Sequence, residues 1–300
     1  MGLCPRVVGG HDGRVPELPE VESLARFLAE RTVGRAIASV ALGTISALKT
    51  FAPAPSDLVG RTVREVTRHG KWLDLATDGP HLVWHLSRAG WVRWYDAAPA
   101  TVVRPGKSPL ALRLVLDDGA GFDLTEQGTR KRLAVHVVDE PEQVPLVASL
   151  GVEPLAPQFT PERFAELARA KNQQVKGLLR DQRTIAGIGN AYSDEILHAA
   201  RMSPFALTGS MSDDDLTRLH GVVQEVLREA LAASAGRPAV ELKDAKRRGM
   251  RVHGRAGETC PVCGDVVREV SFADSALQYC ATCQTGGKPL ADRRLSKLLK

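Results

Sequence analysis

Apolar positions near the start of the chain repeat at helical spacing and then give way to short runs. Val21, Leu24, Ala25 and Leu28 recur every three or four residues, which predicts a helix that ends at Gly34. Beyond it lie short apolar runs separated by Gly, Pro and Asp, at 36–42, 63–66, 72–76, 82–86, 91–95, 110–116, 121–124 and 133–138. Many short strands with turn residues between them predict a β-sandwich or barrel.

The second half of the chain returns to helical spacing. A segment with four prolines, 141–160, predicts a linker. Helical patterns follow it at 161–170, 174–182, 190–200 and 212–234. Ser212 is a good N-cap for the last of these, because three aspartates fill the first turn behind it. The segments 266–272 and 276–279 again predict strands.

Composition adds a mild excess of positive charge to an otherwise ordinary globular chain. The 300 residues are 43% hydrophobic and 25% charged, with a net charge of +5, which permits nucleic-acid binding without requiring it. The stretch 243–255 is rich in Lys and Arg, and a solvated surface is its plainest interpretation. No apolar run approaches the roughly 20 residues that cross a membrane, and the first fifteen residues lack a secretory apolar region. We expect a cytoplasmic, nucleoid-associated bacterial protein with no membrane partner.

Four cysteines near the C-terminus form two Cys-x-x-Cys pairs. Sixteen residues separate the pairs, which are Cys260 with Cys263 and Cys280 with Cys283. Two such pairs joined by a hairpin present four thiolates tetrahedrally, which predicts one structural Zn²⁺; four incidental cysteines are the alternative. A closed site of this kind orders a fold and does not catalyse. Cys4 stands outside the pattern.

Three further segments are ambiguous when each is taken alone. Gly189 and Asn190 close a Gly-Ile-Gly-Asn turn between two helical patterns, where backbone N–H groups and the Asn190 N-cap suit an anion. Such a turn is also common between ordinary helices. Lys71 is equally well a plain turn lysine, and Glu17 and Glu20 the acidic first turn of an ordinary helix.

Their joint order changes this interpretation. Pro-Glu-Leu-Pro-Glu-Val-Glu at 16–22, His-Gly-Lys-Trp-Leu at 69–73, the Gly-Ile-Gly-Asn segment and the paired cysteines resemble the formamidopyrimidine/endonuclease-VIII family of DNA glycosylases. The resemblance runs from residue 16 to about 284, and the opening Pro-Glu-Leu-Pro-Glu favours the formamidopyrimidine branch. It implies an α+β multidomain fold with an N-terminal β-sandwich, a helix–two-turn–helix domain and a C-terminal zinc-finger β-hairpin. It also implies a monomer that binds damaged double-stranded DNA.

The resemblance divides the chain into six parts. Residues 1–15 form a leader, disordered or absent from the mature protein, and 16–140 a catalytic β-sandwich domain with its N-terminal helix. A linker at 141–160 leads to a helix–two-turn–helix domain at 161–250. A zinc finger at 251–284 and a basic tail at 285–300 complete the chain.

The resemblance also implies roles for particular residues. Pro16 attacks C1′ of the damaged nucleotide and forms an iminium, after which the base leaves and the 3′ phosphate is eliminated. Glu17 exchanges protons beside it, and Glu20 orients the amine. Lys71 contacts phosphate and carries protons near the lesion. Asn190, with Gly189, holds a neighbouring phosphate.

Three departures from the family pattern qualify this assignment. Pro16 follows fifteen residues, and an amide nitrogen is no nucleophile, so we expect translation from Val15 or proteolysis to free it. Ser275 stands about where the family carries a hairpin arginine, which predicts weaker δ-elimination or a substitute cation. Arg88 replaces a methionine that fills the gap left by the base, and the loop at 125–132, with Arg132, lacks an aromatic wedge. Arg88 can still stack and contact phosphate, and we expect both Arg88 and Arg132 to contact DNA.

The favoured function is therefore a bifunctional glycosylase and AP lyase acting on oxidised purines. A lyase directed at abasic sites or oxidised pyrimidines is the nearest alternative. A further alternative is not an enzyme: a protein that binds damaged DNA without catalysis, with Pro16 still inside the chain. A zinc-hairpin transcription factor fits the cysteines but leaves the first two motifs unexplained.

Overall fold

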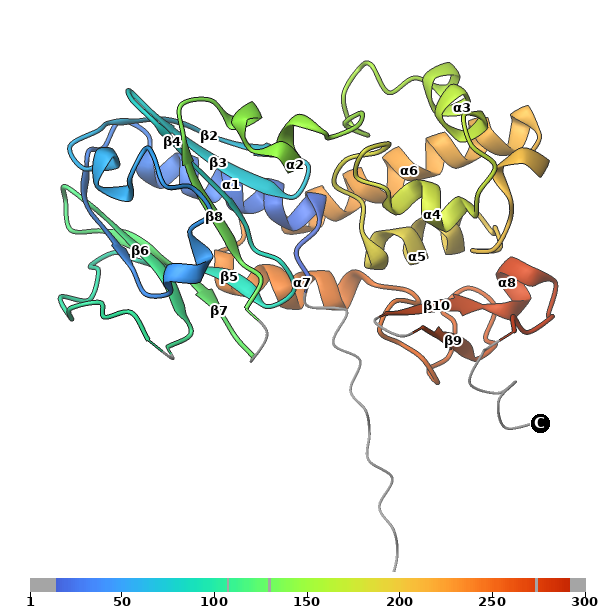
Figure 1. Ribbon diagram of the computed structural model, residues 1–300. Helices are drawn as coiled ribbons and strands as arrows, with labels where there is room; N and C mark the ends of the chain where they lie inside the picture. The colour runs from blue at the N-terminus through green and yellow to red at the C-terminus, as the bar shows by residue number, and fades with distance from the viewer. Residues whose placement is uncertain (1–14, 107, 129–130, 273–274, 292–300) are drawn as a thin grey trace, which may run out of the picture.

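The computed structural model describes residues 15–106, 108–128, 131–272 and 275–291 (Figure 1). The expectations for residues 1–14, including Cys4, and for most of the basic tail lie outside these ranges.

Two four-stranded antiparallel sheets form the N-terminal domain. One sheet has the order β1-β6-β7-β5 and the other β2-β3-β4-β8. The first contains β1 (Ile37–Leu42), β6 (Leu110–Leu116), β7 (Gly121–Glu126) and β5 (Gly90–Tyr95). The second contains β2 (Val63–His69), β3 (Trp72–Thr77), β4 (His81–His85) and β8 (Ala134–Val138). Their inner faces meet where Trp84 stacks on Phe122 with ring centroids 5.9 Å apart, which confirms the sandwich.

Helix α1 (Leu18–Thr32) joins this sandwich to the rest of the molecule. Val21, Leu24 and Leu28 form its apolar stripe and belong to the sandwich core. Leu18, at its first position, belongs instead to the core of the helical domain and is fully buried. The start of α1 is therefore fixed by both domains.

The helical domain packs around the long helix α6, which contacts α1, α3, α5 and α7 (Figure 1). Its helices are α3 (Pro161–Arg169), α4 (Val175–Arg180), α5 (Asn190–Ala199), α6 (Asp213–Ser234) and α7 (Leu242–Gly249). Ser212 caps α6 as predicted, accepting a hydrogen bond from the Asp215 N–H at 3.1 Å. Helix α7 lies in the basic stretch, which was interpreted from the sequence as a solvated surface and not as a helix.

Short helical turns occupy the connections. They are η2 (Ile45–Ala47), η3 (Pro55–Leu58), η4 (Pro141–Gln143), α2 (Pro145–Ala148), η5 (Thr208–Ser210) and η6 (Ala239–Glu241). Val144 and Val147 pack against Trp72 and Val83 of the sandwich, so the first part of the expected linker is docked on a sheet.

A two-stranded hairpin follows the helical domain, formed by β9 (Val267–Ser271) and β10 (Ala276–Cys280). The short α8 (Ala281–Thr285) closes it and carries the last cysteine. In the described ranges, none of the helices combines the length and apolar character needed to cross a bilayer.

Leu18→Ala is expected to lower the free energy of unfolding by about 2–5 kcal/mol, because it leaves a cavity where two domains meet. Urea unfolding measures this. Leu146→Ala, at a leucine that is 58% exposed, is the matched control and should change the value by less than about 0.5 kcal/mol. Equal effects of the two substitutions would contradict the assigned role of Leu18.

Candidate functional site

The carboxylate of Glu17 lies at the N-terminus of α5. Its oxygens accept hydrogen bonds from the backbone N–H groups of Gly189 (2.6 Å), Ala191 (2.9 Å) and Tyr192 (3.2 Å). The carboxylate is 1% exposed. It accepts from N–H groups at the start of α5 that have no partner within the helix. Asn190 is the first residue of α5 and Gly189 its N-cap, so the expected N-cap at Asn190 is corrected. A side chain from α1 supplies the acceptor instead.

Glycine is required at 189 because the space beside it is taken. A Cβ there would lie 2.4 Å from Glu17 Cδ and 2.7 Å from Lys71 Nζ, closer than any real contact. Gly187 has φ of +89°, and a Cβ there would lie 2.8 Å from the Cβ of Leu18. Three sequence motifs therefore meet at one point.

Arg68 stabilises the turn that carries Lys71 by hydrogen bonds. Its guanidinium donates to the Gly70 carbonyl and to Glu153, both at 2.9 Å. It also donates to Glu22 of α1 at 3.1 Å. Arg68 thus fixes the β2–β3 turn against both the helix and the segment after α2.

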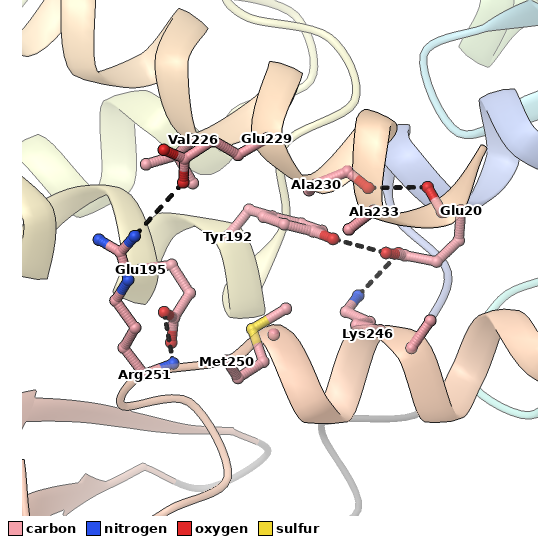
Figure 2. Close-up of a pocket in the computed structure, with 13 residues that line it drawn as sticks. Glu20, Tyr192, Glu195, Val226, Glu229, Ala230, Ala233, Lys246, Met250 and Arg251 are labelled. Carbon is pink, nitrogen blue, oxygen red and sulfur yellow. Dashed lines mark hydrogen bonds and ion pairs between the residues drawn. The ribbon is translucent and has the colours of Figure 1, made fainter. Parts of the chain in front are cut away.

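Glu20 has a hydrogen-bond partner on each oxygen (Figure 2). One oxygen accepts from the Glu17 N–H and from Lys246 Nζ, each at 2.9 Å. The other accepts from the Tyr192 hydroxyl at 2.6 Å. This arrangement fixes the first turn of α1, directly after Pro16. The sequence did not single out Lys246; its helical spacing from apolar Leu242 and Met250 was the available signal.

Charges at this point nearly balance. Burial raises the pKa of Glu17, but Lys246, Lys71 and the N–H of Ala191 outweigh it and hold the pKa at about 2. Burial lowers the pKa of Lys71 to about 8, opposed by Glu17 and reinforced by Lys246 and Arg180. Glu17 is thus an anion at neutral pH that stabilises positive charge. Its expected proton exchange stays a prediction.

A cleft of about 490 Å³ opens beside these residues. It lies between the sandwich and the segment after α4, and Val15 and Lys71 line it together with Arg88, Arg180 and Arg183. Asp181 is the single carboxylate among the described lining residues, so the cleft is cationic. Arg180, the last residue of α4, and Arg183 were not predicted from the sequence.

His85 also lines the cleft but carries no charge at neutral pH. Burial, followed by the nearby Lys71, lowers the pKa of His85 to about 4. Its Nδ1 accepts the Ser87 N–H at 3.0 Å, which places the proton on Nε2.

Pro16 is buried between the start of α1 and this cleft. In the 300-residue chain its nitrogen is the amide of Val15, whose carbonyl accepts a hydrogen bond from Lys246 at 2.8 Å. Pro16 thus precedes Glu17 directly, Lys246 bonds both the carbonyl of this peptide group and Glu20, and Lys71 lines the same cleft as Val15. In this acylated form the nitrogen has no lone pair available for attack.

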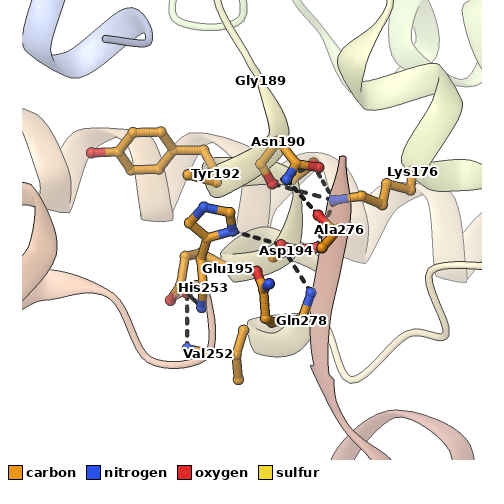
Figure 3. Close-up of polar contacts among 12 residues, drawn as sticks. Lys176, Gly189, Asn190, Tyr192, Asp194, Glu195, Val252, His253, Ala276 and Gln278 are labelled. Atoms are coloured by element: carbon orange, nitrogen blue, oxygen red, sulfur yellow. Dashed lines mark hydrogen bonds and ion pairs between the residues drawn. The ribbon is translucent and has the colours of Figure 1, made fainter. Parts of the chain in front are cut away.

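The four expected DNA contacts separate into two groups. Arg88 lines the cleft, whereas Arg132 is exposed in the β7–β8 connection, outside the described lining residues. The Gly189 N–H is taken by Glu17. The side-chain amide of Asn190 donates to the Ala276 carbonyl of β10 at 2.7 Å (Figure 3). Asn190 thus ties α5 to the hairpin.

A buried network around Asp194 strengthens that tie (Figure 3). Asp194 accepts hydrogen bonds from Lys176 of α4 at 2.5 Å, from His253 Nδ1 at 2.7 Å and from the Gln278 N–H at 3.2 Å. It joins α4, α5, the loop after α7 and β10. No sequence pattern indicated this network, because its members are distant in the chain.

The four cysteines form a compact cluster. All their sulfur atoms lie within 4.8 Å of one another, with Cys260–Cys283 at 3.9 Å and Cys263–Cys280 at 3.3 Å. Thiolates 2.3 Å from a tetrahedral zinc lie about 3.8 Å apart, so the cluster fits this ion. His198 Nε2 lies 3.3 Å from Cys260 Sγ and connects the cluster to α5.

Comparisons with known proteins cover nearly all of the chain. The formamidopyrimidine-DNA glycosylase N-terminal domain matches residues 15–135, its H2TH domain 150–240, and the zinc finger found in FPG and IleRS 257–286. A formamidopyrimidine-DNA glycosylase from Symbiobacterium thermophilum is 34% identical over 294 residues, 93% of either chain.

Two further comparisons add detail. An uncharacterized formamidopyrimidine-DNA glycosylase-like protein from Mycobacterium tuberculosis is 55% identical over 156 residues, 52% of this chain and 98% of that one. The Lactococcus lactis Fpg in complex with abasic-site DNA superposes with a TM-score of 0.77 at 27% identity. The match covers 90% of this chain and 99% of that one.

Glu17→Gln is expected to remove a pH-dependent part of the stability. The folded pKa of about 2 lies below the ordinary 4.5, so the carboxylate stabilises the fold above pH 4.5 and loses this effect as pH falls towards 2. The full effect corresponds to about 3 kcal/mol, of which about 2 kcal/mol is lost between pH 7 and pH 3. Urea unfolding at pH 7 and pH 3 measures it, with the exposed Glu225→Gln as control. A cost of Glu17→Gln that is equal at both pH values would refute the assignment.

Removing the metal is expected to unfold the hairpin and leave the sandwich intact. We expect one zinc per chain by elemental analysis, lost in Cys263→Ser and kept in Cys4→Ser. Hydrogen exchange should then show protection lost at Leu277 and Tyr279 but retained at Leu73. Undiminished protection of the hairpin in zinc-free Cys263→Ser would contradict a structural metal.

Proposed function

Because the chain belongs to the formamidopyrimidine-DNA glycosylase family, we propose that it is a bifunctional DNA glycosylase and AP lyase of base excision repair. Its substrates are oxidised purines in double-stranded DNA, and it acts as a monomer with one structural zinc. The observation that carries this proposal is the convergence of Pro16, Glu17, Lys71 and Gly189 beside one cationic cleft.

The chemistry begins with a damaged nucleotide turned out of the duplex into the cleft. The lone pair of the Pro16 nitrogen forms a bond to C1′, and the base leaves with the pair of the broken C1′–base bond and takes up the proton that the nitrogen loses. The nitrogen lone pair then displaces O4′, which takes a proton from water, and the sugar ring opens to an iminium. Loss of a C2′ proton and departure of the 3′ phosphate cut the strand, and water releases the enzyme from the sugar fragment.

The surrounding residues suit these steps. The Glu17 carboxylate stabilises the positive charge of the iminium, since it is ionised, buried and belongs to the residue that follows Pro16. Lys71 and the arginines of the cleft attract the phosphates on either side of the flipped nucleotide. Arg88 lines the cleft where the family carries an apolar side chain, and we assign it to the gap in the base stack.

The chemistry requires a free amine, so we propose that the active form begins at Pro16. Residues 1–15 are then absent because translation starts at Val15 and its initiator methionine is removed, or because a protease cleaves the chain. Every described helix and strand lies within 16–300 and is kept in this form.

Borohydride trapping on a duplex with one abasic site tests this function. The form that begins at Pro16 should give a covalent protein–DNA adduct, because borohydride reduces the iminium to a stable amine. The 300-residue form, with its N-terminus verified by intact mass, is the matched control and should give none.

Other results would separate the alternatives. Tight binding without an adduct in either form would indicate a non-catalytic binder of damaged DNA. A panel of duplexes with oxidised purines, oxidised pyrimidines and abasic sites then identifies the substrate class. Preference for oxidised pyrimidines would overturn the purine assignment and leave the lyase intact.

A further inference from the structure

Lys246 is buried within the site although it comes from α7, more than two hundred residues after Pro16. Its side chain is 3% exposed. Nζ lies 2.9 Å from Glu20 Oε2, 3.8 Å from Glu17 Oε1 and 4.9 Å from the centre of the Tyr192 ring. None of the motifs at the N-terminus predicts a cation from this helix.

The ammonium of Lys246 also lies close to the reacting nitrogen. Nζ is 2.8 Å from the carbonyl oxygen of Val15. Since bonds of about 1.2 and 1.3 Å join that oxygen to the Pro16 nitrogen, Nζ lies within about 5.4 Å of it. At this separation, in a buried site, two positive charges repel each other strongly.

We propose that Lys246 is a positioning residue for the reaction, which fixes the first turn of α1 through Glu20 and keeps the Pro16 amine unprotonated at neutral pH. The inference rests on the proposed role of Pro16 as nucleophile. An amine must be unprotonated to attack, and its ordinary pKa of about 8 leaves it mostly protonated at pH 7.

The charges around Pro16 show why this cation matters. Helix α1 contributes the carboxylates of Glu17 and Glu20, and the β2–β3 turn contributes Lys71. Helix α5 contributes the neutral hydroxyl of Tyr192. With Lys246 present, two cations face two anions. Without it the net charge is −1, which favours the protonated amine.

More distant titratable groups do not replace it. Glu195 accepts three backbone N–H groups of the loop after α7, and His253 donates to Asp194. His85 is neutral at pH 7, and Arg180 lies on the opposite wall of the cleft from the sandwich. Among the described residues named here, the Lys246 ammonium is therefore the cation that contacts Glu20.

A cavity behind Lys246 makes a clean substitution possible. It has a volume of about 190 Å³ and is lined by Lys246 itself, Glu20, Tyr192 and the apolar Ala230 and Met250 (Figure 2). A methionine at 246 has room there and keeps the aliphatic packing while losing the charge. Glu195, Glu229 and Arg251 also line this cavity, and the substitution leaves them unchanged.

The test is the pH dependence of borohydride trapping with the zinc-loaded form that begins at Pro16. In the wild-type protein the amine should titrate with an apparent pKa below the ordinary value of about 8. Lys246→Met should raise this apparent pKa, and with it the rising limb of the pH profile of trapping, by about one to two pH units. Lys246→Arg keeps the charge and should remain within about half a unit of wild type.

Lys243→Met is the matched control. It removes one cation from the same helix, but Lys243 lies over the Trp91 ring at 4.3 Å, away from Glu20, so the limb should stay in place. If folded Lys246→Met shows the same apparent pKa for trapping as wild type, the inference is overturned. The adduct that it still forms would uphold the proposed function. Should that variant fail to fold, a wild-type limb at or above about pH 8 overturns the inference just as well. If wild type gives no adduct, the proposed function fails first.

Discussion

The buried carboxylate of Glu17 at the N-terminus of α5 is the interaction on which the rest of the site depends. A buried charge is costly unless hydrogen bonds and opposite charges compensate it. Here three backbone N–H groups and the ammonium groups of Lys71 and Lys246 provide that compensation. The carboxylate therefore fixes the distance between α1 and α5, and with it the position of Pro16.

This arrangement explains why the motifs belong together. Gly189 exists as glycine because a side chain would overlap the carboxylate and Lys71, and Glu20 fixes the helix turn that Glu17 begins. The zinc hairpin is linked to the same point, since Asn190 and Asp194 of α5 bond to β10. The hairpin, the helical domain and the sandwich are thus all linked to the N-terminal turn of α5.

Much of the fold follows from local patterns. The apolar runs predicted the strands of the sandwich, and the 3.6-residue spacing predicted α5 and α6, because both signals depend on neighbours in the sequence. The cysteine spacing likewise predicted the cluster. The resemblance of the motifs supplied what periodicity lacks, namely which distant segments meet.

The remainder depends on tertiary contacts that the sequence does not display. Asn190 was expected to cap α5, but the cap is a carboxylate from a helix 172 residues away, so propensity alone pointed to the wrong side chain. Lys246 belongs to a basic stretch that was expected to be a solvated surface, but its side chain is buried. Arg132 is exposed in the β7–β8 connection and is not among the described lining residues of the cleft, so its DNA contact stays a prediction.

The most direct measurement is the location of the covalent bond in the trapped complex, found by proteolysis and mass spectrometry. The account predicts that the sugar remnant is attached to the nitrogen of Pro16 in an N-terminal peptide that begins with that residue. Attachment to a lysine, or to a chain that still carries Val15 before Pro16, would contradict it.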